Sequence, residues 1–275
     1  MNDIETAVAG HSAVPELLSR IYAGLEAAGA DLARLTLEDL APVDEFHIGG
    51  RQATSHALAK LSPGAGDHVL DVGCGIGGAA RFMAWQTGCR VSGIDLTPEF
   101  IETARMLTEK TGLAARVDYE VASALHMPFA DGAFDGAITL HAAMNIRDRA
   151  GLYGEVARVM KPGATFCVYD VMKQGEDALA YPVPWAETGR TSHLTTPDEM
   201  LALLGGAGFD VFEVEDRTDV AREFFKQTLA AISEGPPPLG LNILMGESAP
   251  VKFRNMMENV EQGRIAVVQM LARRT

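Results

Sequence analysis

Short apolar runs alternate with longer amphipathic stretches along most of the chain, from about residue 67 onward. A short apolar run bounded by glycine or proline predicts a strand, whereas apolar residues at every third or fourth position predict a helix. The predicted strands are 68–72, 90–94, 118–122, 134–140, 165–171, 211–216 and 265–272. The predicted helices between them are 79–87, 98–110, 151–160 and 197–207. This alternation is typical of βαβ units, so we expect a doubly wound α/β fold around a mostly parallel sheet.

The N-terminal part of the chain falls outside this alternation. It carries apolar residues such as Leu17, Ile21 and Leu25 at helical spacing, which predicts helices. We interpret residues 1–60 as a helical cap on a core of residues 61–275.

A long insertion separates the last two predicted strands. It has about fifty residues and contains two further helical stretches, 220–233 and 250–262, which is too much for a simple connection. We interpret 219–262 as a lid and 173–195 as a second lid segment over the same edge of the sheet. The alternative is that both segments only cover exposed sheet surface.

Composition and charge narrow the class of ligand. Of 275 residues, 47% are apolar, and 23 Lys and Arg against 37 Asp and Glu give a net charge of −14. Such an acidic surface repels phosphate backbones and anionic lipid, so we expect a small-molecule partner and neither nucleic acid nor membrane. The sequence leaves the oligomeric state open.

The three cysteines, Cys74, Cys89 and Cys167, show no C-x-x-C spacing. They predict buried free thiols in a reducing compartment and no structural zinc. No run approaches the roughly 20 apolar residues of a membrane helix, and the N-terminus lacks the basic and apolar segments of a signal peptide. We therefore expect a cytoplasmic location.

A glycine-rich loop follows the first predicted strand and opens a helix. Its glycines would let a ligand approach the backbone, and the helix N-terminus offers free N–H groups. Gly73, Gly75 and Gly78 satisfy the G-x-G-x-x-G spacing, so a nicotinamide or flavin dinucleotide remains an alternative. Asp95, at the end of the second strand, can accept the ribose hydroxyls of either cofactor class.

Asp71 distinguishes the two cofactor classes. It lies two residues before the first glycine of the loop. A carboxylate there would repel a pyrophosphate, whereas it would attract the ammonium and sulfonium groups of S-adenosylmethionine. The alternative is that Asp71 only caps the loop backbone.

At these motifs the chain resembles the class I S-adenosylmethionine-dependent methyltransferases, in the group of ubiquinone/menaquinone C-methyltransferases and sarcosine/dimethylglycine N-methyltransferases. The matching blocks are 69–77 (VLDVGCGIG), 93–96 (GIDL), 127–135 (MPFADGAFD) and 155–163 (EVARVMKPG). The resemblance implies a seven-stranded sheet whose last strand runs antiparallel, with a lid inserted before that strand. It also implies S-adenosylmethionine as cofactor, S-adenosylhomocysteine as product, and no metal.

The resemblance implies a role for each matching residue at the glycine loop. It places Asp71, Gly73 and Gly75 against the methionine part of the cofactor. It places Asp95 on the ribose and Leu96 on the adenine.

Further expected cofactor contacts lie after the third and fourth strands. Ser123 and Ala124 stand where the family holds the adenine amino group, and the family often has Asp at the first of these positions. Leu140 and His141 stand where family members border both cofactor and substrate.

The segment 44–54 (DEFHIGGRQAT) is similar to the block that closes over the methionine carboxylate in related N-methyltransferases. The resemblance therefore adds Phe46 and His47 to the expected cofactor contacts. Tyr22, where the resemblance begins, is expected to join them.

Methyl transfer is an in-line displacement, so the protein mainly positions the reactants and excludes water. A base is needed only where the acceptor carries a proton, and His141 is the candidate, as a base or as a group that orients the substrate. A structural histidine is the alternative. His47 is a second candidate base but fits a cofactor contact better.

Asn145 and Trp185 are candidate contacts to the acceptor. Many family members have histidine at the position of Asn145, so the mechanism of phosphoethanolamine-type enzymes does not transfer directly to this chain. Phe224 and Phe225 could also line an acceptor pocket, although at adjacent positions of a predicted helix they cannot both face one side.

The predicted function is transfer of methyl from S-adenosylmethionine to a small molecule. The alternatives are a protein that binds this cofactor without transfer, acting as a sensor or scaffold, and a dinucleotide-dependent oxidoreductase, which Asp71 disfavours. The sequence does not distinguish nitrogen, oxygen and carbon acceptors.

Overall fold

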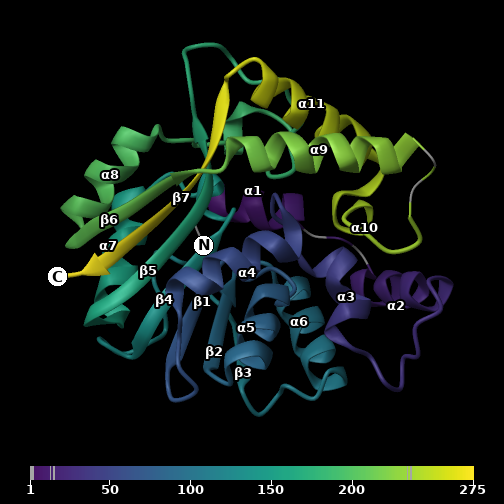
Figure 1. Ribbon diagram of the computed structural model, residues 1–275, viewed down its shortest axis with the longest axis horizontal. Helices are drawn as coiled ribbons and strands as arrows, with labels where there is room; N and C mark the ends of the chain where they lie inside the picture. Colours follow the sequence, from purple (N-terminus) through teal and green to yellow (C-terminus); the bar gives the residue numbers. More distant parts are fainter. Residues whose placement is uncertain (1–2, 13, 15, 234, 236) are drawn as a thin grey trace.

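A seven-stranded sheet forms the centre of the computed structural model, which describes residues 3–12, 14, 16–233, 235 and 237–275 (Figure 1). The strand order is β3-β2-β1-β4-β5-β7-β6. Strands β1 to β5 run parallel, and β7 lies antiparallel between β5 and β6. The strands are β1 (His68–Val72), β2 (Arg90–Asp95), β3 (Val117–Val121), β4 (Phe134–Leu140), β5 (Met160–Lys173), β6 (Phe209–Asp216) and β7 (Ile265–Arg274). The predicted fold class is confirmed.

Strand β5 differs most from its prediction, since it begins at Met160 and not at residue 165. The turn dipeptide Pro162-Gly163 led to the later start. In the structure Met160 pairs with Phe134, and an irregularity between Phe134 and Gly136 accommodates the turn residues within the strand.

Helices cover both faces of the sheet (Figure 1). They are α1 (Asp3–Ser12), α2 (Leu17–Ala27), α3 (Leu37–Asp44), α4 (Gly50–Leu61), α5 (Gly78–Thr87), α6 (Pro98–Lys110), α7 (Arg149–Val159), α8 (Pro197–Gly206), α9 (Thr218–Ser233), α10 (Asn242–Met245) and α11 (Ala249–Glu261). Helices α4, α5 and α6 share one apolar cluster with the sheet, and α7 and α8 share the cluster on the opposite face. Because both faces are covered, the parallel strands are apolar along most of their length.

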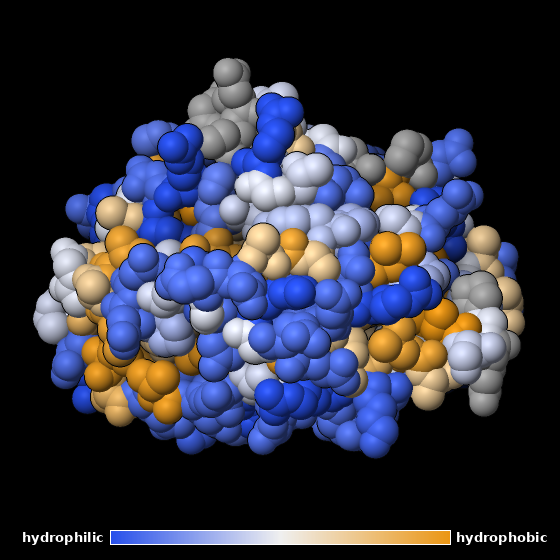
Figure 2. Space-filling model, turned by 90° about the horizontal axis from the view of Figure 1, so that it is seen from above, coloured by the Kyte–Doolittle hydropathy of each residue, from blue (hydrophilic) through white to orange (hydrophobic). Residues whose placement is uncertain are grey.

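The N-terminal helices and the late insertion meet above the strand ends. Helices α9 and α11 lie side by side across the top of the molecule in Figure 1. Leu17, Ile21 and Leu25 of α2 pack in one cluster with Leu239 and Ile243 of the insertion. Seen from above, most of the outer surface is hydrophilic and the apolar groups are scattered (Figure 2). No helix among the described residues is long and apolar enough to cross a membrane.

Candidate functional site

A cavity of about 540 Å³ lies at the carboxyl ends of the parallel strands. The loops after β1, β2, β3 and β4 form its floor, and the 44–48 segment, the 184–185 loop and the insertion form its walls. Open α/β sheets bind ligands at this edge. Its volume lies within the range of about 300–1,000 Å³ that is usual for small-molecule sites.

Thirteen of the fourteen sequence-predicted site residues line this cavity. They are Phe46, His47, Asp71, Gly73, Gly75, Asp95, Leu96, Ser123, Ala124, Leu140, His141, Asn145 and Trp185. Tyr22 is the exception and corrects the prediction, because its ring packs in the apolar cluster between α2, α3 and α10. Part of the wall is formed instead by Glu5 and Val8 of α1.

The three glycines of the motif serve different purposes. A Cβ on Gly73 would lie 2.3 Å from the Cβ of Ala142, and one on Gly78 would lie 2.3 Å from the carbonyl oxygen of Asp44, so these two glycines permit close packing. Gly75 has φ +54° and no atom within 4 Å of its Cβ position, although it lines the cavity. Gly75 is therefore the glycine of the three that keeps space open.

Two carboxylates stand beside this loop without a cationic partner. Asp71 is 2% exposed, and its Oδ2 accepts no hydrogen bond from the described residues. Burial, with Asp95 and Glu45 nearby, raises the pKa of Asp71 to about 7. Burial also raises the pKa of Asp95. The backbone N–H groups of Thr97 and Gly75, which donate to its oxygens at 2.9 and 3.1 Å, lower this pKa and offset part of the effect. A positively charged ligand group would stabilise the ionised form of both carboxylates, whereas a phosphate would destabilise it.

A buried ion pair attaches the 44–54 segment to the glycine loop. Arg81 Nη2 lies 2.5 Å from Asp44 Oδ1, and both side chains are fully buried. Arg81 Nη1 donates to the carbonyl oxygen of Ile76 at 2.8 Å. The guanidinium therefore links the segment over the cavity to the loop beneath it.

His47 is held by its own segment in a defined tautomer. Its Nε2 lies 3.2 Å from the carbonyl oxygen of Gly50 and 2.9 Å from Thr54 Oγ1, which donates to Glu45 at 2.6 Å. A carbonyl oxygen only accepts, so Nε2 carries the proton. Burial lowers the pKa of His47, which favours the neutral ring.

His141 follows β4 with φ +53°, a left-handed conformation that is uncommon outside glycine. Its backbone N–H and its Nδ1 both lie near the carbonyl oxygen of Tyr169, at 2.8 and 3.1 Å. Nδ1 therefore carries the proton, and Nε2 is a buried lone pair without a partner among the described residues. Burial, and His47 with its ring centroid 6.1 Å away, lower the pKa of His141 to about 3, so the imidazole is neutral near pH 7.

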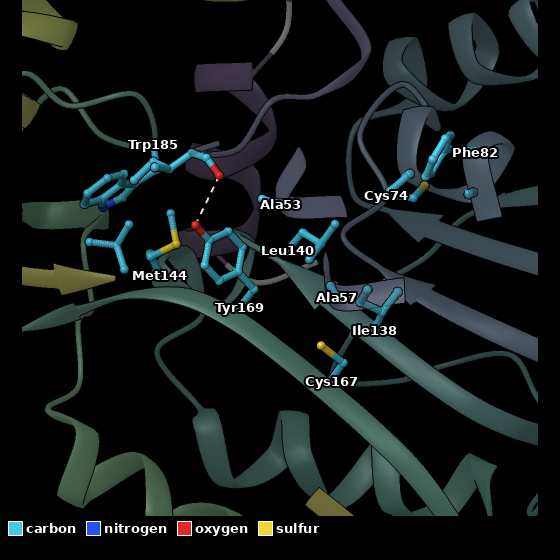
Figure 3. Packing of buried hydrophobic residues seen from close by; sticks show 14 of the residues in the cluster. Ala53, Ala57, Cys74, Phe82, Ile138, Leu140, Met144, Cys167, Tyr169 and Trp185 are labelled. Carbon is cyan, nitrogen blue, oxygen red and sulfur yellow. Dashed lines mark hydrogen bonds between the residues drawn. The ribbon is translucent and has the colours of Figure 1, made fainter. Parts of the chain in front are cut away.

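The side-chain amide of Asn145 holds a loop. Its Nδ2 donates to the carbonyl oxygens of Trp185 and Thr191, at 2.8 and 2.9 Å. Both amide hydrogens are thus used within the protein, and Asn145 as a contact to the acceptor stays a prediction. Trp185, whose Nε1 donates to Ser192 Oγ at 3.0 Å, is 6% exposed and presents its ring to the cavity. Figure 3 shows it near Met144 and Tyr169.

The insertion and the N-terminal helix add further lining residues. Phe224 and Phe225 both border the cavity, and their ring centroids are 5.4 Å apart. Side chains that point to different sides of one helix can border the same cavity where the helix crosses its rim. Glu5 bonds to the hydroxyl of Ser123 across 118 positions of sequence, a contact that no local pattern indicates.

Metal-binding residues are not clustered in the part of the chain that the structure describes. No group of three or more His, Cys, Asp or Glu side chains there could hold an ion.

Comparisons with known proteins agree with this geometry. Residues 70–168 match the family described as "Methyltransferase domain". The O-methyltransferase resE of Aspergillus sclerotiorum is 32% identical over 193 residues, which are 69% of this chain and 72% of that protein.

Solved structures show the same fold at low identity. The [4+2]-cyclase SpnF has a TM-score of 0.73 and 20% identity, over 99% of this chain and 97% of that chain. Geranyl diphosphate C-methyltransferase from Streptomyces coelicolor A3(2), solved with Mg²⁺, geranyl-S-thiolodiphosphate and S-adenosylhomocysteine, has a TM-score of 0.68 and 18% identity, over 82% and 76% of the two chains.

Proposed function

We propose that the chain, which belongs to the class I S-adenosylmethionine-dependent methyltransferases, methylates a small molecule, and that the cavity beneath α9 and α11 holds both reactants. Asp71, Gly73 and Gly75 would contact the methionine part of the cofactor, and Asp95 its ribose. Leu96, Ser123 and Ala124 would surround the adenine. When bound, the cofactor supplies an electrophilic methyl group on a sulfonium.

The observation that carries this assignment is the buried Oδ2 of Asp71, which has no hydrogen-bond partner among the described residues. Burying such an oxygen is costly, and a cationic ligand group offsets that cost. The neighbouring Gly75 adds the open space that a close approach of the ligand needs.

The remaining residues of the site position the reactants and exclude water. His47 and Phe46 close the cavity over the cofactor end, and Trp185 and the insertion cover the acceptor end. His141 lines the cavity with a neutral imidazole whose Nε2 can accept a hydrogen bond from a ligand. Such a site orients reactants in a dry environment, which supplies most of the catalysis in a displacement of this kind.

The competing assignments make different predictions at Asp71. A dinucleotide would bring its pyrophosphate against this carboxylate and the negative charge of Asp95. The fold also occurs in a [4+2]-cyclase, so binding of the cofactor without transfer is the second candidate.

The three cysteines are buried free thiols, which supports the proposed cytoplasmic location.

Isothermal titration with S-adenosylmethionine, S-adenosylhomocysteine and NAD tests the cofactor site. We expect micromolar affinity for both adenosyl compounds, about −8 kcal/mol, and a loss of about tenfold or more in Asp95→Ala through the ribose hydroxyls. Asp210→Ala, on the outer strand β6 and away from the cavity, is the matched control. Tighter binding of NAD would refute the assignment, and absence of methyl transfer to any metabolite in a broad panel would favour the second candidate.

A further inference from the structure

We propose that the acceptor is an uncharged, largely apolar molecule that presents a hydroxyl group to His141 Nε2 and is methylated on that oxygen. This inference rests on the proposed function and specifies its substrate. Three features of the cavity support it: the apolar lid, the distribution of charge, and the tautomer of His141.

The insertion contributes only apolar side chains to the cavity from its helices. These residues are Phe224, Phe225, Leu244, Met245, Phe253 and Met256. Trp185 and Met144, which Figure 3 shows near each other, also line the cavity. Aromatic rings and methionines favour a broad apolar ligand, because they bury large areas and methionine adapts its shape.

The charges that border the cavity exclude an anionic acceptor. Its lining includes Glu5, Asp71 and Asp95, besides Asp44, which is paired with Arg81, and Asp148, which is exposed. The one lysine or arginine among the described lining residues is Arg147, which is exposed. A phosphate or carboxylate would be repelled here and would lack the cations that such groups require.

A protonated amine is disfavoured for a different reason. Asp71 and Asp95 lie at the glycine loop, beneath the cofactor end, and the lid helices contribute no carboxylate to the acceptor end. An ammonium group among the phenylalanine and methionine side chains would lose its hydration and gain only cation–π contacts, with no carboxylate from these helices to pair with it.

His141 specifies the polar group that the acceptor must carry. Because Nδ1–H points to the carbonyl oxygen of Tyr169, Nε2 is an acceptor and needs a donor from the ligand. The backbone N–H of His141 is bound to the same oxygen, so the ring is held in position. A hydroxyl satisfies Nε2 with its hydrogen and keeps an oxygen lone pair for attack, whereas a C–H group is a poor donor.

The step balances in atoms and charge. The acceptor oxygen forms a bond to the methyl carbon, the carbon–sulfur bond breaks, and its electron pair goes to sulfur. The O–H proton moves to His141 Nε2. One positive charge thereby passes from sulfur to the imidazole, and the products are a methyl ether and S-adenosylhomocysteine.

Four probes with one ring system test the substrate class: 2-naphthol, 2-naphthyl phosphate, 2-naphthylmethylammonium and naphthalene. Trp185 lines the cavity and the other tryptophan, Trp85, is 57% exposed, so Trp85→Phe leaves one reporter whose quenching measures binding. The cofactor affinity of this variant is measured first. We expect 2-naphthol to bind about tenfold more tightly than either charged probe, and a few-fold more tightly than naphthalene because it bonds to Nε2.

His141→Asn tests the hydroxyl contact, because asparagine tolerates the left-handed backbone. His193→Asn is the control, since His193 does not line the cavity. We expect labelled methyl to appear on 2-naphthol in the wild type and the control, and to fall by about a hundredfold or more in His141→Asn with cofactor affinity within about threefold.

Several results would overturn the inference while leaving the cofactor assignment intact. These are equal or tighter binding of a charged probe, bound 2-naphthol that receives no methyl group, and full turnover in His141→Asn. Failure of S-adenosylmethionine itself to bind would instead refute the proposed function.

Discussion

Replacing Asp71 by asparagine should stabilise the cofactor-free protein at neutral and alkaline pH. The carboxyl group is buried, and its pKa is raised to about 7 from an ordinary 3.8. Between these values the folded state holds a proton that the unfolded chain has lost, so stability falls as the pH rises through this window. The difference of about 3 in pKa corresponds to a loss of about 4 kcal/mol in the free energy of unfolding. Asp71→Asn should recover this amount above pH 7 and almost none below pH 4.

Thermal unfolding of dialysed protein at pH 5 and pH 8 measures the effect. At about 2–4 °C per kcal/mol for a chain of this size, the variant should melt about 10 °C above the wild type at pH 8 and only a few degrees above it at pH 5. Asp170→Asn is the matched control. Asp170 is equally buried, and burial raises its pKa to about 6, but it lies 3.2 Å from Arg149. Its replacement leaves an uncompensated guanidinium, so the variant should not melt about 10 °C above the wild type at pH 8 as Asp71→Asn does.

The same variant should lose cofactor affinity, because the cation would meet a neutral amide. Its melting temperature should therefore respond less to S-adenosylmethionine than that of the wild type. An equal melting temperature of variant and wild type at pH 8, or an unchanged affinity for the cofactor, would refute the account of Asp71 given above.

Gly75→Val should lose cofactor binding in a titration and keep the fold by circular dichroism. Gly29→Val is the control, because Gly29 has the same left-handed backbone and an open Cβ position outside the cavity, and this variant should keep its affinity for the cofactor. Asn259→Ala should lower the free energy of unfolding by about 2 kcal/mol in urea, because it removes two hydrogen bonds to the backbone of Ala180; a loss below about 0.5 kcal/mol would contradict this. Arg81→Met should lower the free energy of unfolding by about 3–5 kcal/mol, because it leaves the aspartate partner buried and unpaired. An unchanged free energy of unfolding would show that apolar packing can replace the ion pair.

The strands and helices of the core could be predicted because their signals are local. The boundaries of β1, β4 and α6 agree with the prediction, since each begins or ends at a glycine, a proline or a change of periodicity. Strand β5 began earlier than predicted because its pairing with β4 outweighed the turn residues within it. Tertiary pairing can override a local turn signal of this kind.

The sequence by itself determined the glycine loop, the carboxylates around it and the family resemblance, because these follow from neighbouring residues and fixed spacings. Only the tertiary structure decided what the distant residues do. Tyr22 packs in the apolar cluster of the N-terminal helices, and Glu5 accepts a hydrogen bond from Ser123. The side-chain amide of Asn145 donates a hydrogen bond to the loop that carries Trp185.

The chemical state of the site also belongs to the tertiary structure. His141 is neutral, with its lone pair on Nε2, because a carbonyl oxygen from β5 takes the hydrogen of Nδ1 and the surrounding protein removes water. The pKa of Asp71 is raised to about 7 because packing removes water from the carboxyl group and brings Asp95 and Glu45 near it. A pKa and a tautomer depend on burial and on neighbours brought from elsewhere in the chain, and these exist only once the chain has folded.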